Sequence, residues 1–180
     1  MPDVSRHEVA RHVAIVGLLR GKHLMPAKTI LSPQPAACLV RPPRPYDFER
    51  MAELAQQLGY LCSAEQIRAR LAQMQNSQQN AVFVAQAADG KIVGWIGAQV
   101  FRCVELDPFA EITGLVVDEQ SRSCGIGKLL VAAAEQWARS VGSRVLCVRC
   151  NVVRERAQRF YTANGFEEIK VQKIFRKPLR

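Results

Sequence analysis

Histidine is scarce in this chain, with 3 residues among 180, all of them before position 24. The six cysteines follow no disulfide-like rhythm. Cys147 and Cys150 have CxxC spacing, but they fall within a predicted strand, where positions i and i+3 point to opposite faces. Because side chains on opposite faces of a strand cannot chelate one metal ion, we expect no metal site.

Long apolar runs are also missing. No stretch approaches the ~20 residues that a helix needs to cross a bilayer. Residues 14–19 are apolar, but the run is too short for a span, and no convincing signal-peptide cleavage site follows it. The sequence therefore predicts a cytoplasmic protein that makes no contact with membranes.

Acidic residues are few relative to basic ones. The chain has 16 Asp and Glu against 25 Lys and Arg, which gives a net charge of +9. Such a charge attracts anionic ligands at long range, and a nucleic-acid-binding module would account for it. The basic residues are nevertheless spread along the chain, without interleaved aromatic residues or a recognisable nucleic-acid motif. Nucleic acid stays an alternative partner, less favoured than a small anionic ligand.

Prolines and charge divide the chain into two parts. Residues 1–36 form a basic N-terminal extension whose last part, with Pro26, Pro33 and Pro35, is typical of a linker. Within this extension, residues 9–19 could form one short helix. Residues 37–180 have a length that suits a single domain with one hydrophobic core.

Helix and strand patterns predict the elements of this domain. We expect strands at 37–41, 81–87, 91–101, 111–117 and 145–148, helices at 46–58, from 63, from about 125 and after Asn151, and a closing hairpin over 166–177. Ser63 and Gln66 have the form of a capping box, and Asp89-Gly90 is a strong hairpin signal. The pattern indicates an α/β (α+β) domain with a mixed, mostly antiparallel sheet and helices on both faces.

Residues 122–127, Arg-Ser-Cys-Gly-Ile-Gly, stand between a hydrophobic strand and an amphipathic helix. Such a turn aims free backbone N–H groups and the positive end of a helix dipole at one point, which suits a phosphate. Gly125 and Gly127 let a large anion approach the backbone without a Cβ in the way. The turn is not a P-loop, because Arg122 replaces its first glycine, and it is not a dinucleotide-binding turn, because Leu130 replaces a small residue.

A second motif follows one helix and one strand later. Asn151 ends an apolar strand, and the next helix carries Ala157 and Phe160-Tyr161 before it stops at Gly165-Phe166. The two motifs together resemble the conserved segments of the GNAT superfamily, the acetyl-CoA-dependent N-acetyltransferases.

The resemblance extends upstream and covers residues 37–180. Leu58-Gly59-Tyr60, Gly94-Trp95-Ile96 and residues 111–118 are similar to a bacterial group named aminoglycoside 6′-N-acetyltransferase-like. This resemblance implies a GNAT fold, with a sheet of six to seven strands and about four helices. It also implies acetyl-CoA as cosubstrate. Many relatives are homodimers, so the resemblance also implies a homodimer.

The resemblance further implies how the cosubstrate is held. Backbone groups of the strand that ends at Val117 would pair with the pantetheine arm, the turn would bind the pyrophosphate, and Asn151 would bind the pantetheine amides. The expected cosubstrate-binding residues are Leu115, Val116, Val117, Arg122, Ser123, Cys124, Gly125, Ile126, Gly127, Lys128 and Asn151. Relatives usually have glycine at the position of Ser123. For Asn151 the alternative role is that of a helix N-cap.

Two residues are candidates for proton transfer. Glu111 shares one face of its strand with Thr113, Leu115 and Val117 by the period-two rule, so its carboxylate would lie beside the acetyl group as a general base. Its alternative role is a salt bridge. Tyr161 matches the general acid of the family, which protonates the departing thiolate. Its alternative role is core packing.

The acceptor amine is open at this point. Tyr60 and Trp95 could line its site, although each is also a plausible packing residue. The chain carries no acidic cluster between residues 37 and 110 that would attract a polycation. A monoamine, an amino-acid derivative or a peptide amine is therefore as plausible as an aminoglycoside. A catalytically silent acyl-CoA-binding regulator is a second alternative, but such a protein does not need Glu111 and Tyr161 together.

Overall fold

A computed structural model of the protein describes residues 38–75 and 77–179, so the expected extension of residues 1–36 and its helix lie outside the described residues. The described strands are β1 (Cys38–Arg41), β2 (Asn80–Ala87), β3 (Ile92–Phe101), β4 (Phe109–Val117) and β5 (Leu146–Val148). The described helices are α1 (Phe48–Gln57), α2 (Ala64–Gln75), α3 (Ile126–Ser140) and α4 (Glu155–Ala163), and short 3-10 turns lie at Pro45–Asp47 and Glu119–Ser121. None of these helices has the length and apolar character that a membrane crossing requires.

Local sequence signals fix several of these boundaries. Ser63 N–H donates to Gln66 Oε1 at 3.0 Å and Gln66 N–H donates to Ser63 Oγ at 3.3 Å, which confirms the capping box at the start of α2. Gly90 adopts a φ of 87° between β2 and β3, which confirms the hairpin turn. The strong helix and strand patterns therefore predicted these elements correctly.

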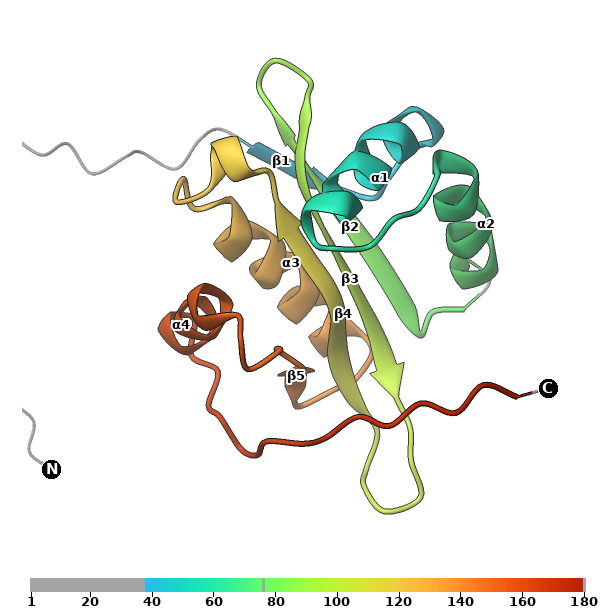
Figure 1. The fold of residues 1–180 in the computed structure, drawn as a ribbon, viewed down its shortest axis with the longest axis vertical. Coiled ribbons are helices and arrows are strands. Elements are labelled where there is room, and N and C mark those ends of the chain that lie inside the picture. Colours follow the sequence, from blue (N-terminus) through green and yellow to red (C-terminus); the bar gives the residue numbers. More distant parts are fainter. Residues whose placement is uncertain (1–37, 76, 180) are drawn as a thin grey trace, which may run out of the picture. The chain divides into compact units, whose positions relative to one another are not determined.

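The strands form one sheet in the order β1-β2-β3-β4-β5. The first four strands are antiparallel neighbours, and β5 runs parallel to β4. Figure 1 shows α1 and α2 on one side of this sheet and α3 on the other. A parallel β5 requires a crossover, and α3 supplies it.

Two apolar clusters hold the layers together. On one face, Ile96, Ile112 and Leu130 belong to a cluster that joins the sheet to α3. On the other face, Leu54 of α1 and Val116 of β4 belong to a cluster that joins the sheet to α1 and α2. Because β3 and β4 contribute to both clusters, these central strands are covered on both faces, and the candidate site is built on β4.

The expected sheet of six to seven strands is wrong in number for the described residues, which form five strands. The expected closing hairpin over 166–177 is absent, and residues 166–179 adopt no regular secondary structure. Alternating apolar and polar residues show that a segment can form a strand, but they do not provide an edge for it to pair with. In the described residues this segment makes no ladder with β5, which is only 3 residues long.

Buried ion pairs fasten α1 to the sheet. Arg41 of β1 donates to both carboxylate oxygens of Asp47, at 2.7 Å and 3.0 Å. Asp118, at the end of β4, is buried and pairs with Arg50 of α1 and with Lys91. The second network fixes the chain at the point where it leaves β4 and enters the turn of residues 122–127.

Candidate active site

β4 and β5 separate halfway along β4. The parallel ladder joins only residues 110–112 of β4 to residues 146–148 of β5. From Thr113 to Val117, no described strand pairs with the edge of β4 that faces away from β3. Figure 1 shows β5 beside only part of β4. The backbone groups on this free edge are open to an extended ligand, as the resemblance implied for residues 115–117.

The turn after β4 has an unusual backbone. Ser123 has a φ of 67° and is the one non-glycine residue with a positive φ in the described part of the chain. Gly125 follows with a φ of 79° as the N-cap of α3. Ser123 therefore lies in the left-handed region, where a Cβ is unfavourable, at the position where relatives usually have glycine.

Free N–H groups converge at the start of α3. Among the described residues, no backbone hydrogen bond outside the helix occupies the N–H groups of residues 123–128. Helix α3 is 15 residues long, so its dipole adds a positive partial charge at this end. The start of α3 therefore has the free N–H groups and the positive dipole end that suit a phosphate.

Cationic side chains surround the turn. Arg122 is partly engaged, because its Nε donates to Val117 O at 3.3 Å and its Nη1 lies 3.2 Å from Glu119. Arg156 of α4 donates to Ser123 Oγ at 3.3 Å. Sequence reasoning missed Arg156, because a contact across 33 residues leaves no trace in the spacing of either motif.

Gly127 has a role that the sequence did not indicate. A Cβ on Gly127 would lie 3.0 Å from the ring of Phe160, which is tighter than most side-chain contacts. This glycine therefore lets α4 approach α3, rather than serving only the approach of an anion. The contact sets the distance between Tyr161, the neighbour of Phe160, and the turn.

Glu111 lies on the opposite face of β4 from the one we expected. Thr113 is an extra residue in the ladder, since Gly97 pairs with Gly114 while Ala98 pairs with Ile112. This bulge reverses the alternation, so Glu111 shares a face with Gly114 and Val116. The expectation that Glu111 shares a face with Thr113, Leu115 and Val117 is wrong, because a period of two cannot be extended across a bulge.

The Glu111 carboxylate is buried and incompletely paired. The residue is 5% exposed, and Arg149 Nη2 lies 3.1 Å from its Oε2. That oxygen has no hydrogen-bond partner in the described part of the protein. Arg149 is itself largely exposed and stacks on Phe101 at 5.3 Å. Glu111 is therefore a buried carboxylate whose charge is balanced by a largely exposed arginine, and Arg149 is a second residue that sequence reasoning missed.

Tyr161 stands between two aromatic rings. Its ring centroid is 5.3 Å from that of Phe160 and 5.4 Å from that of Phe166, both in edge-on geometry. Burial, with a smaller contribution from Cys150, raises the pKa of Tyr161 to about 12. The phenol is therefore protonated at neutral pH, which a proton donor requires. Tyr161 therefore packs between the two rings, as its alternative role predicts, and it keeps the proton that the role of general acid requires.

Asn151 and the remaining candidates have local partners. Asn151 Oδ1 accepts from the N–H of Val153 at 3.1 Å, which stabilises the turn before α4 and leaves the amide NH₂ exposed. Trp95 Nε1 donates to Met51 O at 3.2 Å, and its ring fills the space above Gly114. Trp95 therefore packs over β4 at Gly114.

The loop after α1 meets the segment before α4. Tyr60 is exposed in this loop, and Arg154 Nη2 donates to Leu58 O at 2.7 Å. This bond joins residues that are 96 positions apart. It joins the loop that carries Tyr60 to the segment before α4.

The comparison with known proteins settles the family. Residues 48–166 match the acetyltransferase (GNAT) family. The chain belongs to the GNAT acetyltransferase family. It is accordingly an N-acetyltransferase, and the family predicted from the two motifs is confirmed.

Relatives in the same family share most of the domain. The chain is 32% identical over 148 residues to an aminoglycoside N(6′)-acetyltransferase type 1 from Stenotrophomonas maltophilia, covering 80% of this chain and 95% of that protein. It is 32% identical over 108 residues to the enzyme of the same name from Klebsiella aerogenes, covering 55% and 67% of the two chains. The structure of aminoglycoside N-acetyltransferase AAC(6′)-Iy in complex with CoA has the same fold, with a TM-score of 0.70, 24% identity, and coverage of 83% and 100%.

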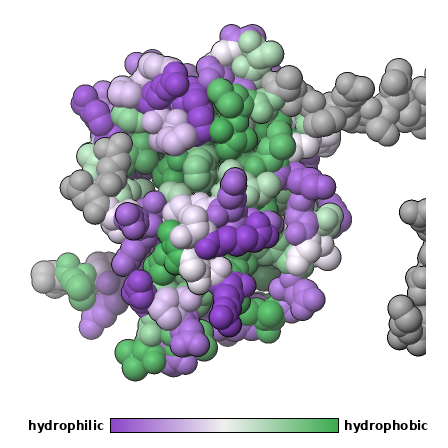
Figure 2. All heavy atoms as spheres, turned by 180° about the vertical axis from the view of Figure 1, so that it is seen from behind, coloured by the Kyte–Doolittle hydropathy of each residue, from purple (hydrophilic) through white to green (hydrophobic). Residues whose placement is uncertain are grey.

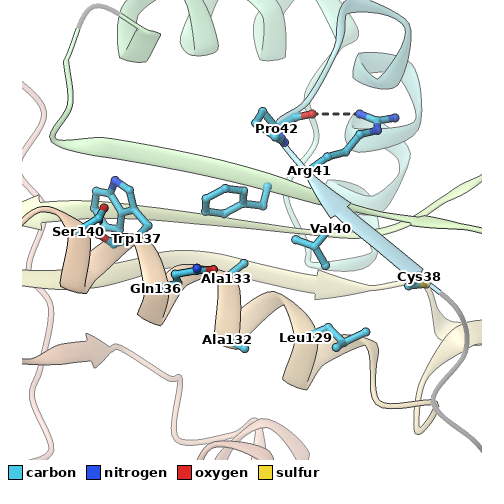
Figure 3. A pocket seen from close by; sticks show the side chains of 11 residues that line it. Cys38, Val40, Arg41, Pro42, Leu129, Ala132, Ala133, Gln136, Trp137 and Ser140 are labelled. Carbon is cyan, nitrogen blue, oxygen red and sulfur yellow. Dashed lines mark hydrogen bonds between the residues drawn. The ribbon is translucent and has the colours of Figure 1, made fainter.

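A separate groove lies on the other side of this GNAT domain. It has a volume of about 580 Å³ and runs between β1 and α3. Figure 3 shows Val40, Leu129, Ala133 and Trp137 along it. None of the candidate site residues lines this groove. The candidate active site is the β4 edge instead, because free backbone groups and a helix N-terminus suit an extended anionic ligand.

The conformation of Ser123 leads to a stability prediction. Replacing Ser123 with Gly should raise the free energy of unfolding by about 1 kcal/mol, because glycine adopts a positive φ without a steric cost. Ser123→Ala is the matched control, since it removes the hydroxyl but keeps the Cβ. Thermal unfolding should rank S123G above the parent protein and S123A no higher than the parent. A lower melting temperature for S123G than for S123A would contradict this account of the turn.

Proposed function

We propose that this GNAT enzyme transfers an acetyl group from acetyl-CoA directly to a primary amine, with Glu111 as the general base and Tyr161 as the general acid. The observation that carries the proposal is the free edge of β4, which leads directly into the open N-terminus of α3. A ligand with an extended arm and a pyrophosphate fits this arrangement, because the arm can pair with the β4 edge while the pyrophosphate reaches the start of α3.

The residues present fit acetyl-CoA. The N–H groups of residues 123–128 would hold the pyrophosphate, and Arg122, Lys128 and Arg156 supply positive charge around it. Leu115, Val116 and Val117 offer their free backbone edge to the pantetheine arm, and the exposed amide of Asn151 would donate to it. Bound acetyl-CoA supplies the activated acyl group as a thioester.

Glu111 would remove the proton that the acceptor amine must lose. Its carboxylate is buried, and although Arg149 Nη2 lies 3.1 Å from Oε2, that oxygen has no hydrogen-bond partner in the described residues, so it can accept a proton. A positioned carboxylate of this kind typically contributes about 100- to 10,000-fold to a rate. Arg149 beside it compensates the buried charge when no amine is present.

Tyr161 would deliver a proton to the departing thiolate. Its phenol is protonated at neutral pH, because burial raises its pKa to about 12. The aromatic rings of Phe160 and Phe166 hold the side chain in place. In this proposal Glu111 and Tyr161 act on opposite partners of the reaction, one on the amine and the other on the sulfur.

The acceptor that we propose to examine first is an aminoglycoside. The support is the similarity to proteins of that name, one of which is matched over 95% of its length. The charge of the chain favours a different acceptor, since Arg149 lies beside Glu111 and the net charge is +9. A monoamine, an amino-acid derivative and a peptide amine are therefore the competing acceptors.

A thiol-release assay with acetyl-CoA decides among these acceptors. We expect turnover with neamine or kanamycin that exceeds turnover with a monoamine, an amino acid and a tripeptide at the same concentration. Mass spectrometry of the product should show one added acetyl group. A preference for the amino acid or the tripeptide would reject the aminoglycoside assignment but keep the N-acetyltransferase. Turnover with none of these amines, despite bound acetyl-CoA, would contradict the proposed acceptor class altogether.

A further inference from the structure

The C-terminal arm, defined here as residues 167–179, is exposed along its whole length and forms no regular secondary structure. No hydrogen bond or ion pair from the arm to the rest of the protein occurs among the described residues. In Figure 1 the arm leaves α4, passes below β5 and crosses the lower end of the sheet, where β4 begins. Figure 2 shows hydrophilic and hydrophobic side chains together at the surface of this lower end. The polar side chains of the arm are therefore accessible to a chemical reaction.

Phe166 ties the start of the arm to the candidate active site. Its ring centroid lies 5.4 Å from that of Tyr161, and its N–H donates to Tyr161 O at 3.1 Å. Lys170 follows Phe166 by four residues, so their Cα atoms are at most about 14 Å apart. The flexible four-carbon stem of the lysine adds to this reach. The tether therefore keeps the Lys170 amine in the neighbourhood of the proposed general acid.

Lys170 also lies near Cys147 of β5. Burial, followed by the Glu111 carboxylate, raises the pKa of the Cys147 thiol. The cations of Arg149 and Lys170 oppose this rise, so both lie within electrostatic range of the thiol. Cys147 is the register partner of Glu111 in the β4–β5 ladder, which puts these two residues one strand spacing apart, about 5 Å. The Lys170 ammonium is thus brought toward the carboxylate that we propose as the general base.

The other described lysines have different surroundings. Lys91 is engaged in an ion pair of 3.5 Å. Lys128 belongs to the first turn of α3, where the pyrophosphate would bind. Lys173 and Lys177 are farther along the arm, so their tether to the site is longer. Lys170 is therefore the lysine that combines an exposed amine, a short tether and a nearby carboxylate.

We propose that the enzyme acetylates the Nζ atom of its own Lys170 when no free acceptor is bound. This inference rests on the proposed acetyl transfer at the same site, and it adds a covalent modification of the chain to that reaction. The tether gives the lysine a high effective concentration, against which a free amine must compete.

The chemical step uses groups that the site already contains. The Lys170 ammonium gives a proton to Glu111 and becomes a neutral amine, which attacks the carbonyl carbon of the thioester. The C–N bond forms, the C–S bond breaks, and the departing thiolate takes a proton from Tyr161. The products are an acetyl-lysine and CoA, so no oxidant or further reactant is needed. Acetylation removes the positive charge of Lys170, so the modified arm no longer competes with a cationic acceptor.

Mass spectrometry after incubation with acetyl-CoA alone tests the proposal. The parent protein should gain the mass of one acetyl group, and peptide mapping should place that group on Lys170. Lys170→Arg should remove the modification, whereas Lys173→Arg, the matched control on the same arm, should keep it. Glu111→Gln should slow the modification by about 100-fold or more, since it removes the base. The rate constant should not depend on protein concentration, because the lysine and the site belong to one chain.

Chemical acetylation without catalysis is the competing explanation. It would modify Lys170 and Lys173 equally, in the parent protein and in E111Q alike, and that pattern would overturn the proposal. Turnover of a free amine by a protein that leaves Lys170 unmodified would also overturn it, but would keep the proposed function. If acetyl-CoA binds and neither Lys170 nor a free amine is acetylated, both the proposal and the proposed function are rejected. A rate constant that rises in proportion to protein concentration would overturn transfer within one chain.

Discussion

Replacing Glu111 with Gln should lower kcat/KM for the acceptor amine by about 100- to 10,000-fold, because the variant keeps the shape of the side chain but cannot accept a proton. Binding of acetyl-CoA should stay within twofold of the parent, since the turn of residues 122–128 does not contact Glu111. The measurement is steady-state thiol release at saturating acetyl-CoA, with calorimetry for the binding constant.

A matched control separates this effect from a general loss of charge. Glu135→Gln removes an acidic side chain of α3 that pairs with Arg139 at the surface, and its kcat/KM should change less than twofold. If E111Q retains more than half of the parent activity, Glu111 acts only as the partner of Arg149, and the base must be sought elsewhere. Thermal unfolding of both variants confirms that each is folded.

Replacing Asp47 with Ala should lower the free energy of unfolding by about 3–5 kcal/mol, because it leaves the Arg41 guanidinium buried without its partner. Arg41 and Asp47 side chains are 7% and 1% exposed, and Arg44 N–H also donates to Asp47 at 2.6 Å. Urea denaturation measures the change. The control is Glu53→Ala, whose 60% exposed carboxylate pairs with Arg50 and should matter by less than about 1 kcal/mol. Equal decreases in the free energy of unfolding for D47A and E53A would contradict the claim that burial makes the Arg41–Asp47 pair the more important one.

The same ion pair predicts how stability responds to acid. Burial by itself would raise the pKa of Asp47, but hydrogen bonds from Arg41 and from the Arg44 N–H outweigh it, so the net pKa is lowered. A lowered folded pKa stabilises the protein above the unfolded value of about 3.9, and this contribution is lost as the pH falls through the folded value. The melting temperatures of the parent and D47A, compared from pH 7 downwards, should therefore begin to approach each other below about pH 4. A difference in melting temperature between the parent and D47A that stays constant at low pH would contradict the lowered pKa of Asp47.

Local patterns were sufficient to predict the motifs and the elements that carry them. The turn of residues 122–127, the capping box at Ser63 and the hairpin at Asp89-Gly90 each depend on residues that are close in sequence. Such signals can be recognised from residue spacing alone, because caps and turns depend on residues that are close in sequence. They also sufficed to predict the family.

The parts that failed depend on long-range structure. The bulge at Thr113 reverses the face of Glu111, and it arises from the pairing of β4 with β3. Arg149 and Arg156 reach the site across the fold, so no spacing within a motif reveals them. The closing hairpin was predicted from an alternating segment, but the pattern could not show whether an edge in the same chain receives it.

Calorimetric titration with acetyl-CoA tests the central claim most directly. If the turn of residues 122–128 and the free edge of β4 form the cosubstrate site, acetyl-CoA should bind one-to-one with micromolar affinity, desulfo-CoA should bind comparably, and ATP should bind much more weakly. Arg156→Gln should weaken acetyl-CoA binding, since it removes a charge beside the turn. Absence of acetyl-CoA binding at low salt would contradict the assignment of this site.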